Sequence, residues 1–360
     1  MLKKLDRYII SKFLFTFIFI MAMLVSIAIV IDLTEKVADL IEKHVSFFDV
    51  ATKYYLYFIP YIGSLLAHFF IFISVIFFTS QLAGKSEFIA MLSGGISYNR
   101  ILLPYFIAAT ILMVVIYFGN NKFVPLSNKA RLQFENTYIN RVRFNQNKNA
   151  HRQIGADQYL YVDNYNPKDS IGFKMTLEQI RDGKLKYKLH AEKMEWNKKV
   201  NKWRLYNYVE RIINPSGSDI IRSGAYIDTT FVISPSRIFT SYVRSDEMTT
   251  EELNNKIDEI KATGAEGNVY YEIEKYRRTA AAFSVYIFTL MGVSLASRKT
   301  RGGIGYHLMV GIALCAAFEI VMKFTTTFST NANLPAVIGV WIPNIVYSLI
   351  AIYFYKNAQK

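Results

Sequence analysis

The sequence predicts an α-helical membrane protein with six transmembrane helices, three before and three after an inserted extracytoplasmic all-β, jelly-roll-like domain. Two observations predict this fold. Hydrophobic residues make up 52% of the 360 residues, and they gather into six long runs near the two ends of the chain. Between these runs the sequence is polar and changes to short alternating segments. We therefore predict three parts: membrane helices in 1–121, a β domain in 122–275, and membrane helices in 276–360.

Each apolar run is long enough to cross a bilayer, which takes about 20 residues at a rise of about 1.5 Å each. The first run is too long for the core of a signal peptide and lacks a small-residue cleavage site after it, so we interpret it as a retained span. The expected spans are 10–31, 54–80, 101–119, 279–296, 304–323 and 335–355.

Basic residues indicate the orientation of the spans. If the spans alternate, one side of the membrane receives the basic residues Lys3, Lys4, Arg7, Lys12, Lys85, Arg100, Arg298, Lys299, Arg301, Lys356 and Lys360. Because lysine and arginine are concentrated in cytoplasmic loops, we expect both termini in the cytoplasm and the β domain on the other side. This signal explains much of the net charge of +14 and argues against a nucleic-acid partner. The only cysteine, Cys315, lies in the fifth run, which excludes an intrachain disulfide.

The polar block reads as short strands separated by turns. Strand candidates are 159–162, 172–177, 185–189, 202–206 and 230–233, and Asp182-Gly183 between two of them is typical of a hairpin turn. Several short strands at this spacing indicate a sandwich or jelly roll. A helix is expected near 249–262, with Thr249 and Glu252 as a capping box and Leu253, Ile257 and Ile260 on one face.

The connection between the second and third spans predicts a short helix near 86–95. Gly84-Lys85-Ser86 imitates the end of a phosphate-binding loop, but Thr79 stands where that loop requires glycine, so no nucleotide site is predicted. Ser86 is a candidate cap, Glu87 lies in the first turn, and Gly94 marks the end. Its apolar residues Phe88, Met91 and Leu92 suit the groove of a soluble partner, while a simple interfacial turn is the alternative.

Ionisable residues within the runs raise a different possibility. Glu319 and Lys323 stand four residues apart in the fifth run, a spacing that favours a mutual ion pair. His68, in the second run, is expected to form a hydrogen bond within the bundle; a proton relay is the alternative. The charges of 272–278 precede the fourth span, where they can pair internally, reach lipid headgroups or engage a charged substrate.

Four segments together resemble the LptF/LptG permease family. They are Leu5-Asp6-Arg7-Tyr8-Ile9, the stretch from Lys85-Ser86-Glu87 to Gly94-Gly95-Ile96-Ser97, Arg301-Gly302-Gly303, and Trp341-Ile342-Pro343-Asn344. The resemblance covers the whole chain, and the Leu-Asp-Arg-Tyr start is slightly more similar to the LptG side. It implies a permease that extracts lipopolysaccharide from the outer leaflet of the bacterial inner membrane.

The resemblance also implies partners and site residues. The partners would be a cytoplasmic ATPase dimer, a second LptF/LptG-type permease, and a periplasmic or membrane-anchored jelly-roll bridge protein that receives the lipopolysaccharide. Glu87, Phe88, Met91 and Gly94 would form the ATPase-coupling helix. Lys36, Lys129 and Arg131 would hold the lipid headgroup, although Glu35, Asp39 and Glu42 are interspersed after the first span.

Two other functions stay open. The chain could be a proton-coupled secondary transporter that uses His68, Glu319 and Lys323, although the two halves show no internal repeat. It could also be a membrane-anchored receptor or assembly factor whose β domain binds a partner. An enzyme is the least expected class, because His151 and His190 lack a nucleophile or metal-ligand spacing beside them. No cofactor or metal is predicted.

Overall fold

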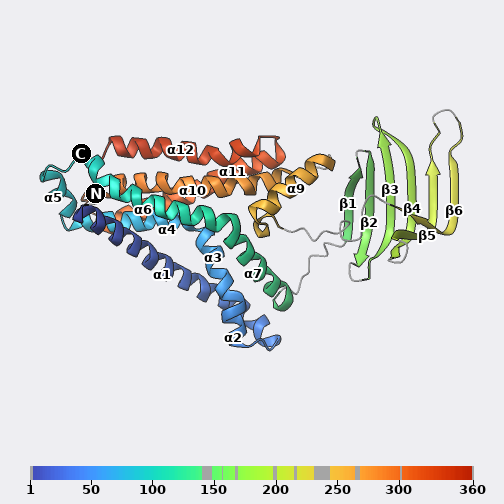
Figure 1. Cartoon of the computed structure of the whole chain (residues 1–360), viewed down its shortest axis with the longest axis horizontal. Coiled ribbons are helices and arrows are strands. Elements are labelled where there is room, and N and C mark those ends of the chain that lie inside the picture. Colours follow the sequence, from blue (N-terminus) through green and yellow to red (C-terminus); the bar gives the residue numbers. More distant parts are fainter. Residues whose placement is uncertain are drawn as a thin grey trace. The chain divides into compact units, whose positions relative to one another are not determined.

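The structure, a computed structural model, confirms the predicted fold class (Figure 1). It describes residues 3–139, 148–155, 157–166, 169–197, 201–214, 217–230, 244–263, 268–300 and 302–358. Within these ranges, six helices are long and apolar enough to cross a membrane. In sequence, a six-stranded antiparallel sheet is inserted between the third and the fourth of them. The chain divides into a helical unit (1–139, 245–253 and 269–360) and a β unit (140–244 and 254–268).

The helices follow the apolar runs, with short helices in the connections. In chain order they are α1 (Lys4–Glu42), α2 (Phe47–Val50), the π-helical turn η1 (Ala51–Tyr55), α3 (Leu56–Leu65), α4 (Ala67–Gly84), α5 (Glu87–Ser93), α6 (Tyr98–Phe118), the π-helical turn η2 (Gly119–Phe123), α7 (Val124–Tyr138), the 3-10 turn η3 (Ser245–Glu247), α9 (Thr250–Thr263), α10 (Asn268–Ala296), α11 (Gly303–Asn331) and α12 (Ala336–Lys356).

The second predicted span is an interrupted helix. The chain leaves helical geometry at Leu66 (φ −105°, ψ 16°), between α3 and α4. Pro60 lies inside α3, six residues before the interruption. The break therefore separates an outer segment, η1 with α3, from the long helix α4, and it brings His68 to the start of α4.

The helical core is built on α4, which is buried along much of its length. Small residues let the neighbouring helices approach it closely: a Cβ placed on Gly292 of α10 would lie 2.8 Å from Cγ1 of Val75, and one on Gly311 of α11 would collide with Ile76. Glycine at such contacts is typical of packed membrane helices, because backbones can then approach.

The β unit is a single meander in the described residues. Its strands, β1 (Lys148–Gly155), β2 (Gln158–Asn166), β3 (Ile171–Arg181), β4 (Lys184–Asn197), β5 (Lys202–Ile212) and β6 (Ile220–Thr229), are hydrogen-bonded in sequence order. Asp182 (φ 51°) and Gly183 (φ 69°) turn β3 into β4, which confirms the predicted hairpin. Leu160 of β2, Leu177 of β3 and Leu189 of β4 are paired across these strands and belong to one buried cluster.

Four of the predicted strands coincide with β2 to β5, whereas β1 and β6 were not predicted. Thr230 follows β6 without strand geometry, and the rest of the candidate strand 230–233 lies outside the described residues. The predicted capping box is present: the Glu252 amide donates to Thr249 Oγ1 at 3.3 Å, and the Thr249 amide donates to Glu252 Oε2 at 2.7 Å.

Candidate functional site

Helix α5 lies at the end of the helical unit where α1 begins and α12 ends (Figure 1). Its apolar residues anchor it to the chain's own core, since Phe88 is buried with its ring 6.1 Å from that of Tyr98, and Met91 packs on the same cluster. Ser86 precedes α5 with a left-handed backbone (φ 61°) and makes no side-chain cap, so its predicted capping role is wrong. Gly94 ends the helix, as expected.

Glu87 is the acidic residue of α5. It is half-buried and accepts a hydrogen bond from Tyr8 Oη at 3.3 Å. Beside it, Asp6 accepts two bonds from the Arg100 guanidinium, at 2.6 and 2.7 Å, and one from the amide of Lys3 at 2.8 Å. The start of α1, the start of α6 and α5 are therefore joined by polar contacts.

A second group of polar residues joins α1, η1 and α7. We name Asp32, Lys36, Tyr54, Arg131 and Glu135 the Glu135 cluster. A single oxygen, Glu135 Oε1, accepts from Lys36 Nζ at 2.7 Å, Arg131 Nη1 at 2.8 Å and Tyr54 Oη at 2.8 Å. Lys36 also pairs with Asp32 at 2.6 Å and contacts the Tyr54 hydroxyl. The four charged side chains are between 8% and 17% exposed, so solvent screens their attraction little.

The Glu135 cluster brings together two of the three residues predicted to hold a lipid headgroup. Lys36 and Arg131 meet there, but the two carboxylates balance their charge. Arg131 is held further by Asn128 Oδ1, at 2.9 and 3.1 Å, and lies over the Tyr61 ring. Lys129, the third predicted residue, is half-buried and makes no ion pair with the described residues. An anion that approached this cluster would compete with Glu135 for its donors.

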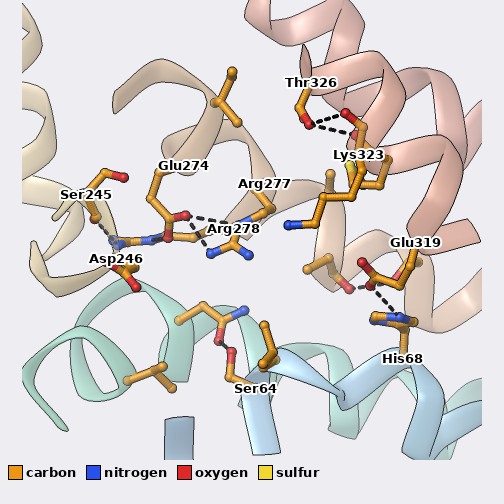
Figure 2. A pocket seen from close by; sticks show the side chains of 18 of the residues that line it. Ser64, His68, Ser245, Asp246, Glu274, Arg277, Arg278, Glu319, Lys323 and Thr326 are labelled. Atoms are coloured by element: carbon orange, nitrogen blue, oxygen red, sulfur yellow. Dashed lines mark hydrogen bonds and ion pairs between the residues drawn. The ribbon is translucent and has the colours of Figure 1, made fainter. Parts of the chain in front are cut away.

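The third group lines a cavity of about 340 Å³ within the helical unit (Figure 2). Residues of α3, α4, α10, α11 and α12 surround it, and the break at Leu66 adjoins it, between the lining residues Leu65 and His68. We name it the Arg277 cavity. Its charged or titratable residues, leaving aside two tyrosines, are His68, Asp246, Glu274, Arg277, Arg278, Glu319 and Lys323.

Glu274 organises one wall of the Arg277 cavity. Its Oε2 accepts from Arg277 Nη2 at 2.6 Å and Nε at 3.0 Å, and its Oε1 accepts from Arg278 Nε at 3.1 Å. The Arg278 side chain is 3% exposed and also donates to Thr250 Oγ1 and to the carbonyl oxygens of Ser245 and Met248. The Arg277 side chain is 43% exposed. One carboxylate therefore serves two guanidinium groups, one fixed in the protein and one open to the cavity.

The opposite wall holds a histidine and a carboxylate. His68 Nε2 lies 3.0 Å from Glu319 Oε1, and its ring packs against those of Phe288 and Phe318. This contact confirms the expected hydrogen bond of His68 within the bundle. The predicted ion pair between Glu319 and Lys323 is wrong, because Glu319 is directed to His68 on α4. Lys323 makes no ion pair with any described residue, and Figure 2 shows its ammonium group extending into the cavity.

Sequence reasoning did not connect Tyr54 or Glu135 of the Glu135 cluster with Lys36. Tyr54 and Glu135 stand 18 and 99 residues from Lys36, and no local spacing connects them. It did identify the charged stretch before the fourth span, and Glu274 shows that internal pairing accounts for part of it. Within the described ranges, no three histidine, cysteine or acidic side chains are placed to hold a metal ion.

Comparison with known proteins gives one result. The family model described as "Lipopolysaccharide export system permease LptF/LptG" matches residues 7–357. The match includes all six candidate spans and the inserted β unit. This model describes LptF and LptG together, so the match does not distinguish them. No curated protein matches the chain.

Proposed function

Because the chain belongs to the LptF/LptG family, a family of transporter components, we propose that it is a permease subunit that extracts lipopolysaccharide from the outer leaflet of the bacterial inner membrane. The observation that carries this proposal is the family match over residues 7–357, which includes both the membrane helices and the β unit. Both termini would lie in the cytoplasm and the β unit in the periplasm, as the basic residues of the short connections predict.

A separate cytoplasmic ATPase dimer would supply the energy. The sequence contains no phosphate-binding loop, and the acidic helix α5 lies at the end of the helical unit that carries both termini. Glu87 would contact the ATPase, while Phe88 and Met91 fix α5 to the permease, and Gly94 ends the helix. A push on α5 would reach α1 through the contacts of Tyr8 and Asp6.

A second LptF/LptG-type permease would complete the lipid path, and a jelly-roll bridge protein would receive the lipid. Strand β6 supports the second step. It pairs with β5 on one side and is exposed over most of its length, including Ile221 and Tyr226. Among the described residues no strand pairs with the other edge of β6, and an edge strand offers free main-chain groups to a strand from another β protein.

Lys36, Lys129 and Arg131 would meet the headgroup of the lipid. The Glu135 cluster adds a condition to this part of the proposal, because the Glu135 carboxylate already binds Lys36 and Arg131, and a phosphate would have to exchange with it or share their donors. Lys129, which has no such competitor among the described residues, can act without that exchange.

One observation favours a second function, proton-coupled transport. The pair of His68 and Glu319 lies at the cavity beside an interrupted helix, an arrangement that recurs in secondary transporters. In that case transport by the purified chain in vesicles would follow an imposed proton gradient without any ATPase, and His68→Gln would abolish it. ATP-dependent transport that ignores the gradient would eliminate this candidate.

The proposed function is tested by purification of the tagged chain from membranes, with identification of the proteins and lipids that come with it. We expect an ATPase and lipopolysaccharide with the wild type, and loss of lipid-stimulated ATP hydrolysis in Glu87→Ala. The control is Glu251→Ala, which removes an exposed acid on α9. If neither an ATPase nor lipopolysaccharide accompanies the folded chain, the export function is wrong and the receptor or assembly role becomes the better explanation.

A further inference from the structure

Helix α6 begins directly after α5, and its first three side chains contact different helices. Four residues, 94–97, connect α5 to α6, and Gly95 among them has a left-handed backbone (φ 80°). Ser97 caps α6, since its hydroxyl accepts a hydrogen bond from the Arg100 amide at 3.4 Å. We name Tyr98-Asn99-Arg100 the α6 turn. The cap fixes its backbone, so its three side chains keep defined directions.

Tyr98 is the buried residue of the α6 turn, at 4% exposure. Its ring lies 6.1 Å from that of Phe88 of α5 and 5.8 Å from that of Tyr355 of α12. Its hydroxyl donates a hydrogen bond to Ser294 Oγ of α10 at 3.2 Å. A buried tyrosine combines an apolar ring with a hydroxyl that takes a partner, and both parts are used here. Tyr98 therefore contacts the buried anchor of α5 and two helices from the second half of the chain.

Asn99 and Arg100 extend these contacts. The Tyr355 hydroxyl donates to Asn99 Oδ1 at 2.6 Å, which makes a second contact with α12. The Arg100 guanidinium donates two bonds to Asp6 of α1, at 2.6 and 2.7 Å, and the Asp6 side chain is 2% exposed. Three consecutive residues thus join α6 to α1, α5, α10 and α12.

The α6 turn holds α1 more firmly than α5 does by itself. The direct contact between α5 and α1 is one exposed hydrogen bond of 3.3 Å, from Tyr8 to Glu87. The contact of Arg100 with Asp6 is bidentate, charge-assisted and shorter. Charge-assisted bonds are about twice as strong as neutral ones, and a bidentate pair also fixes the relative orientation of its two partners. The stronger connection between this end of α1 and its neighbours therefore runs through α6.

We propose that Tyr98, Asn99 and Arg100 position α5 against the other helices, so that a displacement of α5 moves α1, α10 and α12 together. This inference rests on the proposed function, in which a separate ATPase acts on α5. The three are positioning residues, because they act through α5 and the neighbouring helices. Closely packed side chains transmit a displacement, since the interior has little free space to absorb it.

The test measures how lipid binding and ATP hydrolysis affect each other. The full chain is purified with the ATPase that accompanies it and placed in lipid nanodiscs with or without lipopolysaccharide. ATP hydrolysis is measured in both, and thermal unfolding shows whether each variant is folded. Coupling between two sites is reciprocal, so weaker coupling lowers the stimulation by lipopolysaccharide and leaves hydrolysis without it unchanged. A purely structural role would instead lower both rates, or the unfolding temperature.

The central variant is Tyr98→Phe, which keeps the ring and removes only the hydroxyl that binds Ser294. Its matched control is Tyr286→Phe, because the Tyr286 hydroxyl also joins α10 to α6, by a bond of 3.0 Å to Thr110, farther along the helix. Arg100→Gln removes the ion pair with Asp6, and Arg100→Lys is the conservative variant that retains the charge.

We expect Tyr98→Phe and Arg100→Gln to lower the stimulation by about 5-fold, with unchanged hydrolysis in its absence. Arg100→Lys restores part of it, and Tyr286→Phe behaves as the wild type. If Arg100→Gln does not fold, the comparison of Tyr98→Phe with Tyr286→Phe decides. Full stimulation in folded Tyr98→Phe, or an equal loss in Tyr286→Phe, overturns this inference alone. A wild type that copurifies with no ATPase, or shows no stimulation, overturns the proposed function and this inference with it.

Discussion

The Glu135 cluster and the Arg277 cavity are built from the same kinds of residue but differ in how their charges are matched. In the cluster, Lys36 and Arg131 face Asp32 and Glu135, so two cations meet two carboxylates. In the cavity, Glu274 serves two arginines and Lys323 has no acidic partner among the described residues. The cluster is thus a closed contact between helices. In the cavity, Asp246, Glu274 and Glu319 balance the three cations in number, but the Lys323 ammonium group forms no ion pair with a described residue. Basic residues alone do not identify a phosphate site; the carboxylates beside them decide.

The largest expected effect comes from Arg278→Met, which tests whether the Glu274 wall of the Arg277 cavity depends on Arg278. The change would leave Glu274 without a buried partner and the carbonyl groups of Ser245 and Met248 without their donor. Breaking a buried ion pair in this way costs about 3–5 kcal/mol. We expect a marked fall in the thermal unfolding temperature of the chain in detergent. Unchanged stability would mean that the wall of the cavity does not depend on Arg278.

Glu135→Gln tests the closed state of the cluster. The neutral amide leaves Lys36 and Arg131 close together with less compensation, so we expect a loss of stability of about 2 kcal/mol and a gain in phosphate affinity. Unfolding in detergent and phosphate titration measure the two effects. Asp49→Asn, which breaks the exposed pair with Lys53, is the control and should change stability by less than about 1 kcal/mol. A lower phosphate affinity in Glu135→Gln would contradict the competition between Glu135 and phosphate.

Lys36→Gln combined with Glu135→Gln sharpens the comparison. If the two residues act mainly on each other, the double variant is less destabilised than the sum of the single variants, by about 1–2 kcal/mol. The same cycle on Lys323 and Glu319 should show a weaker coupling, since they form no ion pair. Additive effects in the first cycle, or strong coupling in the second, would reverse the distinction between the two regions.

The smallest effect is expected in the β unit, where Arg204 pairs with Asp228 on an exposed surface. Hydrogen bonds from Arg204 lower the pKa of Asp228 below its ordinary value of 3.8. The pair therefore stabilises the fold above that pH, and its contribution is lost as the pH falls below it. We expect Asp228→Asn to lower the unfolding temperature slightly at pH 7 and by less at pH 3. A difference that grows on acidification would disprove this assignment.

The sequence predicted those features that depend on local chemistry. Long apolar runs marked the six spans, Asp182-Gly183 marked a hairpin, and Thr249 with Glu252 marked a capping box, because each signal lies within one short segment. Strand β6 escaped prediction because Gly224 and polar residues interrupt its pattern.

The candidate site depends in part on contacts between residues far apart in sequence, which no local pattern records. Lys36 meets Glu135 across 99 residues, and His68 takes Glu319 away from Lys323. Glu319 contacts His68 of α4 and not Lys323, four residues further along its own helix, because the packing of α4 against α11 places His68 Nε2 3.0 Å from the Glu319 carboxylate. Ser86 likewise fails as a cap because its left-handed backbone leaves its hydroxyl without a helix amide to bind.

The length of α1 has a mechanical consequence. This helix runs without interruption for 39 residues, with Asp6 beside α5 near its start and Lys36 in the Glu135 cluster near its end. Thirty residues separate them, about 45 Å along a straight helix, so a tilt of about 5° about one end moves the other by roughly 4 Å. A shift of that size exceeds the length of a hydrogen bond. A small rotation of α1 beside Glu87 would therefore move its other end far enough to open the salt bridge between Lys36 and Glu135.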